Sequence, residues 1–289
     1  MENMQKDNHI FYADEKDFNE IKKLWDICFS EFPEFSEWYF ENIFQANNTL
    51  VYKENGVICS MLQELNFEFY STSGNKKATY IYGACTHPLY RKRGLMGKLL
   101  EQSFANDKAK GIDFSILIPE NEELFRFYEK FGYKPTTKIE TEIVTKNENI
   151  VSNDYTLKIA NFSDIENINS LYLTMEKETN LILRTNDYWK TQIKMFNELG
   201  GYCFCLYNKS TNNLDAYSFV WNETPLFAQE IIFKDQKSKD TLCQNILTYI
   251  SNSTDIKLNI YKPTGNYTAC IKSHNNEVIS SYLINMLYN

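Results

Sequence analysis

The sequence lacks a long apolar run and an excess of basic charge, and we expect no secretory leader. No stretch approaches the roughly 20 consecutive apolar residues that a membrane-spanning helix needs, so we expect no membrane association. The segment Met1–Asp17 is polar and acidic, and it therefore differs from a cleavable leader. The formal net charge of -8 over 289 residues leaves no basic footprint for nucleic acid, and we expect no such partner.

Cysteine is present, but without the pattern of a disulfide framework. The seven cysteines are odd in number and lie mostly inside apolar segments, at Cys28, Cys59, Cys85, Cys203, Cys205, Cys243 and Cys270. Such usage suits a reducing compartment, so we expect a cytoplasmic protein with free thiols. Cys203 and Cys205 stand one residue apart inside an expected strand, and we expect no metal site there.

The chain is rich in core-forming residues and long enough for two domains. Hydrophobic residues make up 43% of it, with 20 Tyr and 20 Phe, so it can bury sizeable cores and is not expected to be disordered. The polar, Asn-rich stretch Thr145–Asp154 predicts a domain boundary. We therefore expect one domain over residues 1–148 and a second over residues 155–289.

The predicted elements of the first half mix strands and helices. Apolar periodicity and turn residues predict strands at Ile10–Ala13, Thr49–Tyr52, Val57–Phe69, Ala78–Thr86, Asp113–Pro119 and Ile139–Val144, and helices from Asp14, from a cap at Ser36, over Gly94–Lys110 and over Glu122–Lys130. The turn Glu54-Asn55-Gly56 should join the second and third of these strands. We expect the last of the strands to complete the first domain.

The second half repeats this element order without repeating its residue identities. A tandem duplication explains the repeat; the alternative is an unrelated α+β domain that shares a common element order. We expect an α/β (α+β) fold, with a mixed, mostly antiparallel sheet flanked by helices in each domain.

One segment, Gly83–Leu100, has the features of an anion site. A strand ends in a turn at Pro88, a basic run follows, and a helix begins near Gly94. The free N–H groups and the dipole of a helix N-terminus suit a phosphate or pyrophosphate. The alternative is a solvated basic turn before an amphipathic helix. The segment contains neither the phosphate-binding loop GxxxxGK[ST] nor the dinucleotide fingerprint GxGxxG.

Two motifs in this region resemble the GNAT acetyltransferase superfamily. Its signature Arg/Gln-x-x-Gly-x-Gly/Ala is matched at Arg91 and Gly94, with Met96 in place of the small residue and Gly97 beside it. Downstream, Asn121 to Tyr133 resembles the superfamily's Asn-x6-Tyr-Glu-Lys-x-Gly-Phe segment. The resemblance is specific over roughly residues 50–135 and only architectural elsewhere. The layout resembles that of tandem-domain, Eis-like acetyltransferases, and we expect the chain to lack their third domain.

The resemblance implies acetyl-coenzyme A as co-substrate and no metal. The residues implied to bind it are Ala84, Cys85, Thr86, Arg91, Lys92, Arg93, Gly94, Leu95, Met96, Gly97, Lys98, Asn121 and Phe125. Backbone N–H groups around Ala84–Thr86 would polarise the acetyl carbonyl. Tyr128 would act as general acid beside the departing sulfur; the alternative for Tyr128 is a packed aromatic residue.

The implied reaction is direct attack of a neutral amine on the thioester. An acyl-enzyme on Cys85 is not expected, because no His or Asp stands beside it in the sequence. A base is needed, yet the strand Ala78–Thr86 carries no carboxylate. The substrate-side candidates are Glu31, Glu34, Glu64 and Glu68. In Eis-like relatives the terminal carboxylate enters the active site, which makes Asn289 a further candidate.

The second half has no matching cofactor loop. Lys234–Asp240 stands where the glycines would fall, and it offers charge without close backbone approach. We expect the second domain to bind no coenzyme. The function indicated is N-acetyltransfer to a small cationic amine. The alternatives are a non-catalytic regulatory module that binds acyl-coenzyme A, and a protein or peptide N-acetyltransferase.

Overall fold

The computed structural model describes residues 9–70, 74–147, 150, 152–177, 180–250, 254–261, 266–275 and 282–283. The chain divides into two compact units, each built from separated stretches of sequence. Unit 1 comprises Met1–Phe69, Asn75–Pro135 and Ala269–Ile279, and unit 2 comprises Tyr70–Gly74, Thr136–Thr268 and Ser280–Asn289.

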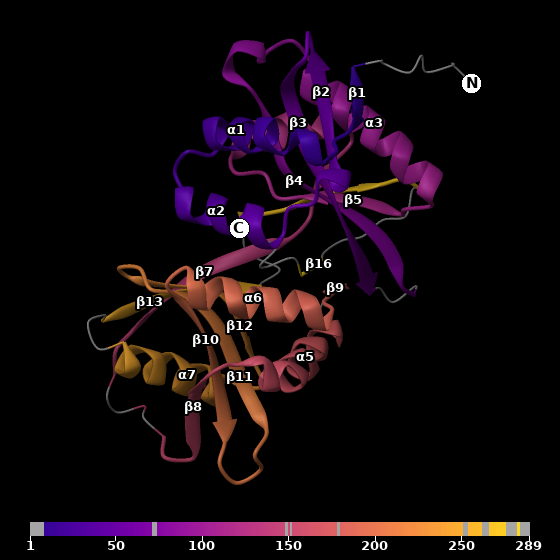
Figure 1. Cartoon of the computed structure of the whole chain (residues 1–289). Coiled ribbons are helices and arrows are strands. Elements are labelled where there is room, and N and C mark those ends of the chain that lie inside the picture. Colours follow the sequence, from indigo (N-terminus) through magenta and orange to yellow (C-terminus); the bar gives the residue numbers. More distant parts are fainter. Residues whose placement is uncertain are drawn as a thin grey trace. The chain divides into compact units, whose positions relative to one another are not determined.

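Unit 1 is built on a sheet of order β1-β2-β3-β4-β5-β15-β6 (Figure 1). Its elements are β1 (Ile10–Tyr12), α1 (Phe18–Cys28), α2 (Pro33–Asn42), β2 (Thr49–Glu54), β3 (Val57–Tyr70), β4 (Lys76–Thr86), α3 (Leu95–Lys110), β5 (Phe114–Leu117), α4 (Glu122–Glu129), β6 (Lys134–Pro135) and β15 (Cys270–Ser273). Strands β4 and β5 are parallel, and the other neighbouring pairs are antiparallel.

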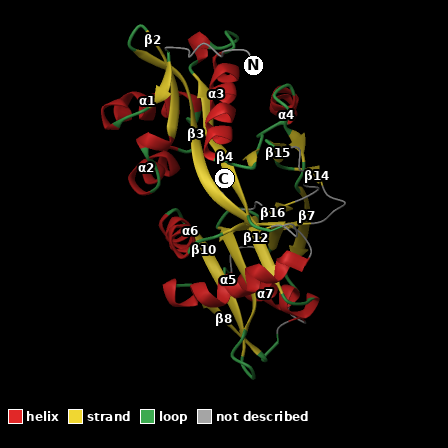
Figure 2. Ribbon diagram, turned by 90° about the vertical axis from the view of Figure 1, so that its right-hand side faces the viewer, coloured by secondary structure: helices red, strands yellow, loops and turns green. Residues whose placement is uncertain are grey.

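Helices cover both faces of this sheet (Figure 2). On one face, Leu95 and Leu99 of α3 pack in a core cluster with Ile81 of β4. On the other face, Trp25 of α1 stacks on Tyr39 of α2, with ring centroids 5.0 Å apart. Both faces of the central strands are therefore buried, which fixes their register.

The start of α2 differs from the sequence prediction. Ser36 is not the N-cap: the helix begins at Pro33, and Ser36 lies inside it, where its hydroxyl donates to Asp26 at 2.6 Å. Proline is favoured in the first turn of a helix because its missing N–H has no partner there anyway. The predicted turn at Asn55-Gly56 does join β2 to β3, and both residues have positive φ.

Unit 2 repeats the arrangement around a second sheet, of order β14-β7-β13-β12-β11-β10-β8. Its elements are β7 (Lys138–Thr145), β8 (Tyr155–Ile159), α5 (Ile165–Leu173), β9 (Asn180–Leu183), α6 (Asn186–Glu198), β10 (Gly201–Asn208), β11 (Leu214–Trp221), β12 (Leu226–Phe233), α7 (Gln236–Tyr249), β13 (Asp255–Tyr261), β14 (Asn266–Tyr267) and β16 (Tyr282–Leu283). Strands β12 and β13 are parallel, and β16 pairs with β9. The predicted fold class, mostly antiparallel sheets flanked by helices, is confirmed.

The predicted strand Ile139–Val144 is present, but its assignment to the first domain is wrong. Strand β7 contains Ile139–Val144 but pairs with β13 in the sheet of unit 2, where Ile143 lies opposite Lys257. The edge of β5 is instead paired with β15, whose Cys270 and Ile271 are buried. The alternation of apolar and polar residues along a short strand indicates which side chains face a core. It does not indicate which sheet the strand joins. The expected 1–148 and 155–289 boundaries therefore do not follow the two units.

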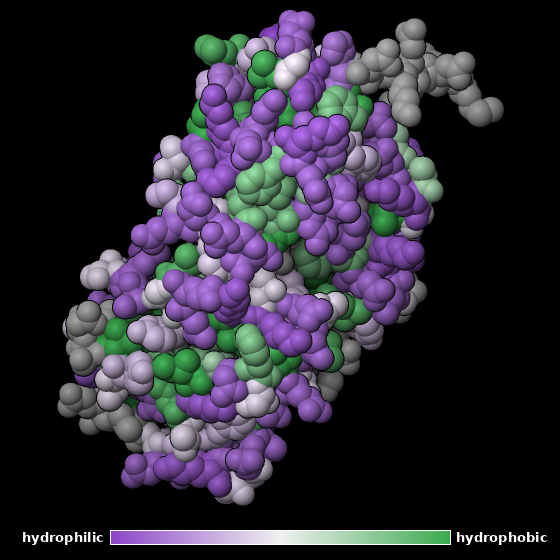
Figure 3. Space-filling view, viewed as in Figure 1, coloured by the Kyte–Doolittle hydropathy of each residue, from purple (hydrophilic) through white to green (hydrophobic). Residues whose placement is uncertain are grey.

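The described part of the chain offers no membrane-spanning helix: none of its helices combines the necessary length with the necessary apolar content. On the face shown in Figure 3, hydrophobic residues are interspersed among hydrophilic ones. Such scattered surface apolar residues are normal for a folded protein and indicate no interaction site by themselves.

Candidate functional site

The candidate site begins where β4 and β5 part. Their parallel pairing covers Ala78–Tyr80 opposite Phe114–Ile116. Beyond it, β4 continues to Thr86, while β5 ends at Leu117. The backbone of Ile81–Thr86 on the β5 side therefore lies outside the described ladder. An open strand edge of this kind can pair with an extended, amide-bearing ligand.

A β-bulge changes the direction of β4 at this point. Met61 of β3 lies opposite Cys85 and Gln63 opposite Tyr82, so Gly83 and Ala84 together oppose one residue of β3. Gly83 has φ of +55°, and a Cβ there would collide with the Trp25 ring. Glycine is therefore required at position 83 both by the backbone and by packing. Bulges redirect backbone N–H groups and are common beside active sites.

The loop after β4 leads to a helix N-terminus that no side chain caps. Gly94 is the N-cap of α3, with φ of 74° and no side-chain cap hydrogen bond. The first intrahelical bond joins the Lys98 N–H to the Gly94 carbonyl at 3.1 Å. The N–H groups of Leu95, Met96 and Gly97 precede it and have no acceptor within the helix. They form a ready anion site together with the helix dipole.

The basic residues of the loop differ in their surroundings. Arg91 is exposed, and its Nε donates to the Thr86 carbonyl at 3.1 Å. Arg93 pairs with Glu54 at 2.8 Å and lies over the Tyr90 ring. Lys92 and Lys98 are exposed at the surface. The predicted cluster of positive charge is present, although the Arg93 charge is partly offset by Glu54.

Packing against Phe131 requires a glycine at position 97. A Cβ at this position would lie 2.9 Å from Cζ of Phe131, so the helix can approach that ring only through glycine. Leu95 is buried in the same core, and Met96 packs against it half-buried. The sequence analysis places Gly97 among the residues implied to bind the coenzyme, and the Phe131 ring is a separate reason for glycine at this position.

Helix α4 places Tyr128 beside β4 and β15. Asn121 caps α4 through the Leu124 N–H at 3.1 Å, and Phe125 is half-buried in the same cluster as Tyr128. Within the described part of the chain, the Tyr128 hydroxyl has no hydrogen-bond partner. Burial, and then the neighbouring thiols Cys270 and Cys85, raise the pKa of Tyr128 to about 12. Its phenol is therefore a neutral hydrogen-bond donor at ordinary pH.

Two of the four candidate carboxylates lie on β3, where Glu64 follows Gln63 of the bulge and Glu68 lies further along the strand. Glu64 is 3% exposed, accepts from the Tyr12 hydroxyl and lies 3.5 Å from Nζ of Lys110. Glu68 is exposed and lies opposite Lys77, at the far end of β4 from Thr86. Glu64 thus belongs to a buried polar cluster of unit 1, whereas Glu68 lies too far along the strand to reach a substrate at Thr86.

Glu31 and Glu34 lie on either side of the start of α2. Both are exposed, as is the 67% exposed Phe32 between them. The segment is carried by the same helix pair, α1 and α2, that packs against β4 through Trp25 and Tyr82, whose ring centroids are 5.7 Å apart. Exposed carboxylates with an exposed aromatic ring suit a cationic ligand. Asn289 lies outside the described residues.

A residue that the sequence reasoning did not single out is Cys28. It ends α1, and its Sγ lies 3.6 Å from the Thr86 carbonyl oxygen. The Cys85 thiol lies within hydrogen-bonding reach of it. In the sequence, Cys28 is only the last member of an apolar helix face, and no local pattern connects it to β4.

In unit 2 the helix N-terminus that corresponds to that of α3 is occupied by a side chain of the protein. Pairing of β12 with β13 covers Leu226–Ala228, and β12 continues to Phe233, as in unit 1. The following helix is capped by Asp235, whose carboxylate accepts the Ser238 N–H at 2.8 Å. A carboxylate at a helix N-terminus takes the place that an anionic ligand would need.

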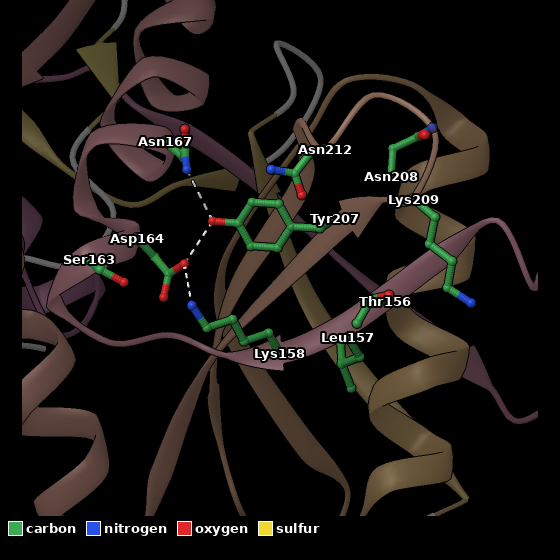
Figure 4. Close-up of a pocket in the computed structure, with 10 residues that line it drawn as sticks. All are labelled: Thr156, Leu157, Lys158, Ser163, Asp164, Asn167, Tyr207, Asn208, Lys209 and Asn212. Carbon is green, nitrogen blue, oxygen red and sulfur yellow. Dashed lines mark hydrogen bonds and ion pairs between the residues drawn. The ribbon is translucent and has the colours of Figure 1, made fainter.

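A pocket in unit 2 lies elsewhere, between β8, α5 and the end of β10 (Figure 4). Its central groups already satisfy one another: the Asp164 carboxylate lies 2.8 Å from Lys158 Nζ and accepts from the Tyr207 hydroxyl at 2.8 Å. Such a neutralised cluster leaves little for a ligand to bind. Among the described residues, no three His, Cys, Asp or Glu side chains gather as a metal site.

Comparison with known proteins identifies the first half of the chain. Residues 9–136 match the family described as an acetyltransferase (GNAT) domain. This match covers 128 of the 289 residues. Among curated proteins, no sequence matches the chain.

Solved structures share the fold of this chain over both halves. They include a GCN5-related N-acetyltransferase from Anabaena variabilis, with TM-score 0.74 and 14% identity, covering 92% of this chain and 72% of that one. Eis1 from Mycobacterium abscessus gives TM-score 0.68 and 9% identity, covering 92% and 74%. A tandem GNAT protein from the clavulanic acid biosynthesis pathway gives TM-score 0.57 and 10% identity, covering 92% and 97%.

Proposed function

We propose that the chain is an N-acetyltransferase that transfers an acetyl group from acetyl-coenzyme A to a primary amine by direct attack. The observation that carries this proposal is the combination of an open β4 edge with the uncapped N-terminus of α3 in a GNAT domain. The alternative of a solvated basic turn does not explain why the strand edge stays open beside it.

The residues fit the coenzyme in two places. The first-turn N–H groups after Gly94 suit the pyrophosphate, with Arg91, Lys92 and Lys98 supplying positive charge. The open edge at Ala84–Thr86 suits the amide-bearing pantetheine arm and, at the bulge, the acetyl carbonyl. When bound, the coenzyme supplies an activated thioester.

Tyr128 acts as a hydrogen-bond donor in this proposal. An ordinary alkyl thiol has a pKa of about 8.5, so a phenol whose pKa is raised to about 12 does not readily give up its proton to a departing thiolate. It can stabilise that thiolate by hydrogen bonding, and the proton comes from the attacking amine instead. The Tyr128 hydroxyl is suited to this because no described residue competes for it.

We further propose that the acceptor is a small cationic amine. Glu31, Glu34 and Phe32 offer two exposed carboxylates beside an exposed ring. Attraction by the carboxylates would favour a cation, and the ring would contribute a cation–π contact of about 0.5–1 kcal/mol at an exposed site.

The test is calorimetric titration of the purified chain with acetyl-coenzyme A, followed by mass spectrometry of amine panels and lysine peptides after incubation. Binding together with acetylated small amines supports the proposal. Acetylated peptides alone would assign a peptide acceptor, and binding without any product would leave a regulatory module. A folded chain that binds no acetyl-coenzyme A would overturn the acetyltransferase assignment.

The charge of the acceptor is tested by a double substitution. Glu31→Gln with Glu34→Gln should raise KM for a cationic amine and leave KM for acetyl-coenzyme A unchanged. The matched control is Glu122→Gln with Glu123→Gln, which changes two exposed carboxylates at the start of α4. Equal effects of the two pairs would contradict a specific role for Glu31 and Glu34.

A further inference from the structure

Two free thiols meet at the bulge of β4. Cys28 is the last residue of α1 and Cys85 lies on β4, and their side chains are within hydrogen-bonding reach of each other. Neither is in a disulfide. The 3.6 Å contact from Cys28 Sγ to the Thr86 carbonyl independently places the Cys28 side chain against this strand.

The two thiols are not equivalent. Cys28 is half-buried, while Cys85 is 8% exposed. The hydrogen bond from Cys85 and the Arg91 guanidinium lower the pKa of Cys28 to about 7, whereas burial raises the pKa of Cys85 well above its usual range. Cys28 is therefore the accessible partner that ionises first, and Cys85 is a shielded neighbour.

In unit 2 a second pair of thiols, Cys203 and Cys205, is also in contact, but neither thiol is accessible. Cys203 and Cys205 lie two positions apart on β10, and both are fully buried. Burial raises the pKa of Cys203 well above its usual range. Residues at i and i+2 of a strand are roughly 6.5–7 Å apart, at or beyond the usual span of a disulfide. This pair serves as an internal control.

We propose that Cys28 and Cys85 form a peroxide-reactive pair, in which Cys28 is oxidised by a hydroperoxide and Cys85 then closes a disulfide between α1 and β4. Accessible thiolates next to a second thiol are the sites at which proteins undergo this oxidation. The proposal concerns a modification site and does not require that the chain be an acetyltransferase.

The chemistry balances in two steps. The Cys28 thiolate attacks one peroxide oxygen, the O–O bond breaks, and the departing hydroxide takes a proton to become water, which leaves a sulfenic acid on Cys28. The Cys85 sulfur then attacks the Cys28 sulfur, the S–O bond breaks, and the proton lost by Cys85 leaves with the hydroxide as a second water. Two thiols lose two electrons and two protons, and one hydrogen peroxide becomes two waters.

The test is a peptide map of the reduced full-length chain before and after hydrogen peroxide, with free thiols capped by N-ethylmaleimide. Trypsin places the two residues in separate peptides, Leu24–Lys53 and Ala78–Arg91, each with a single cysteine. We expect these two peptides to become linked, and to separate again on reduction with dithiothreitol. Cys203 and Cys205 should stay unlinked.

Variants separate the two steps. In Cys85→Ala, Cys28 should stop at the sulfenic acid and be trapped by dimedone; in Cys28→Ala, Cys85 should remain unoxidised. Cys59→Ala, which removes another buried thiol of unit 1, should still form the link. Capped Cys28 after peroxide treatment of the wild-type chain, or a link that forms between other cysteines instead, would overturn the proposal even if a variant failed to fold.

Discussion

Gly94 and Asp235 occupy the same place in the two units, at the N-terminus of the helix that follows the first strand of the parallel pair. Asp235 fills its helix N-terminus with its own carboxylate, and Gly94 has no side chain that could do so. The two units therefore differ at the one feature that an anionic coenzyme needs. Calorimetry should give one coenzyme site per chain, and two sites would contradict this account.

Gly94→Asp should abolish most acetyl-coenzyme A binding. A carboxylate at this helix N-terminus places a negative charge where the pyrophosphate is proposed to bind, as Asp235 does in unit 2. The matched control is Gly94→Asn, because Asn and Asp both tolerate the left-handed backbone at φ of 74°. We expect Gly94→Asp to bind at least about tenfold more weakly than Gly94→Asn, a difference of about 1.4 kcal/mol. Equal affinities would place the pyrophosphate elsewhere.

Tyr128→Phe should slow the reaction without unfolding the protein. The hydroxyl has no described hydrogen-bond partner to lose, so the urea midpoint should shift little. If the phenol stabilises the leaving thiolate, kcat should fall by about 10²-fold, the typical loss for one donor at a developing charge, while KM for acetyl-coenzyme A stays within about twofold. A variant with unchanged kcat would make Tyr128 a packed aromatic residue only.

The ionisation of Cys28 predicts a distinct pH profile for its alkylation. Because the hydrogen bond from Cys85 and the charge of Arg91 lower its pKa to about 7, the reactive thiolate should appear as pH rises through about 7, well below the usual pKa of about 8.5 for a free cysteine. Mass spectrometry of iodoacetamide-treated protein gives the midpoint. Cys85→Ala removes the largest cause of the shift, so its midpoint should move upward. A wild-type midpoint near 8.5 or above would contradict the described thiol contact.

Local features of the fold could be predicted from the sequence, and non-local ones could not. The turn at Asn55-Gly56 and the helix start at Gly94 are set by residues next to each other in the chain, and both appear as predicted. The start of α2 shows the limit even of local reasoning, since Pro33 rather than Ser36 begins the helix. Pro33 and Ser36 are both acceptable helix starts and lie within one turn of each other. Only the packing of the helix decides which of them begins it.

Strand partners and side-chain contacts depend on distant segments. Nothing in the alternation of β7 indicates that it joins β13, or that β15 pairs with β5. The contact of Cys28 with Cys85 and the burial of Glu64 beside Tyr12 also follow from how helices pack on the sheet. Sequence patterns therefore predicted which loop forms the candidate site, but not which side chains from α1 and β15 surround it.

The place of β15 in unit 1 predicts a stabilising role for His274. Its Nε2 lies 3.0 Å from the Asp107 carboxylate of α3, both side chains are nearly fully buried, and Thr79 donates to the other carboxylate oxygen at 2.7 Å. His274→Ala removes one hydrogen-bond partner of a buried carboxylate, which typically costs about 1.5–3 kcal/mol of the free energy of unfolding. Ser273→Ala, a change at the preceding residue that ends β15, should cost less than about 0.5 kcal/mol. Urea denaturation measures both, and equal midpoints for the two variants would show that β15 is not held in unit 1 through Asp107.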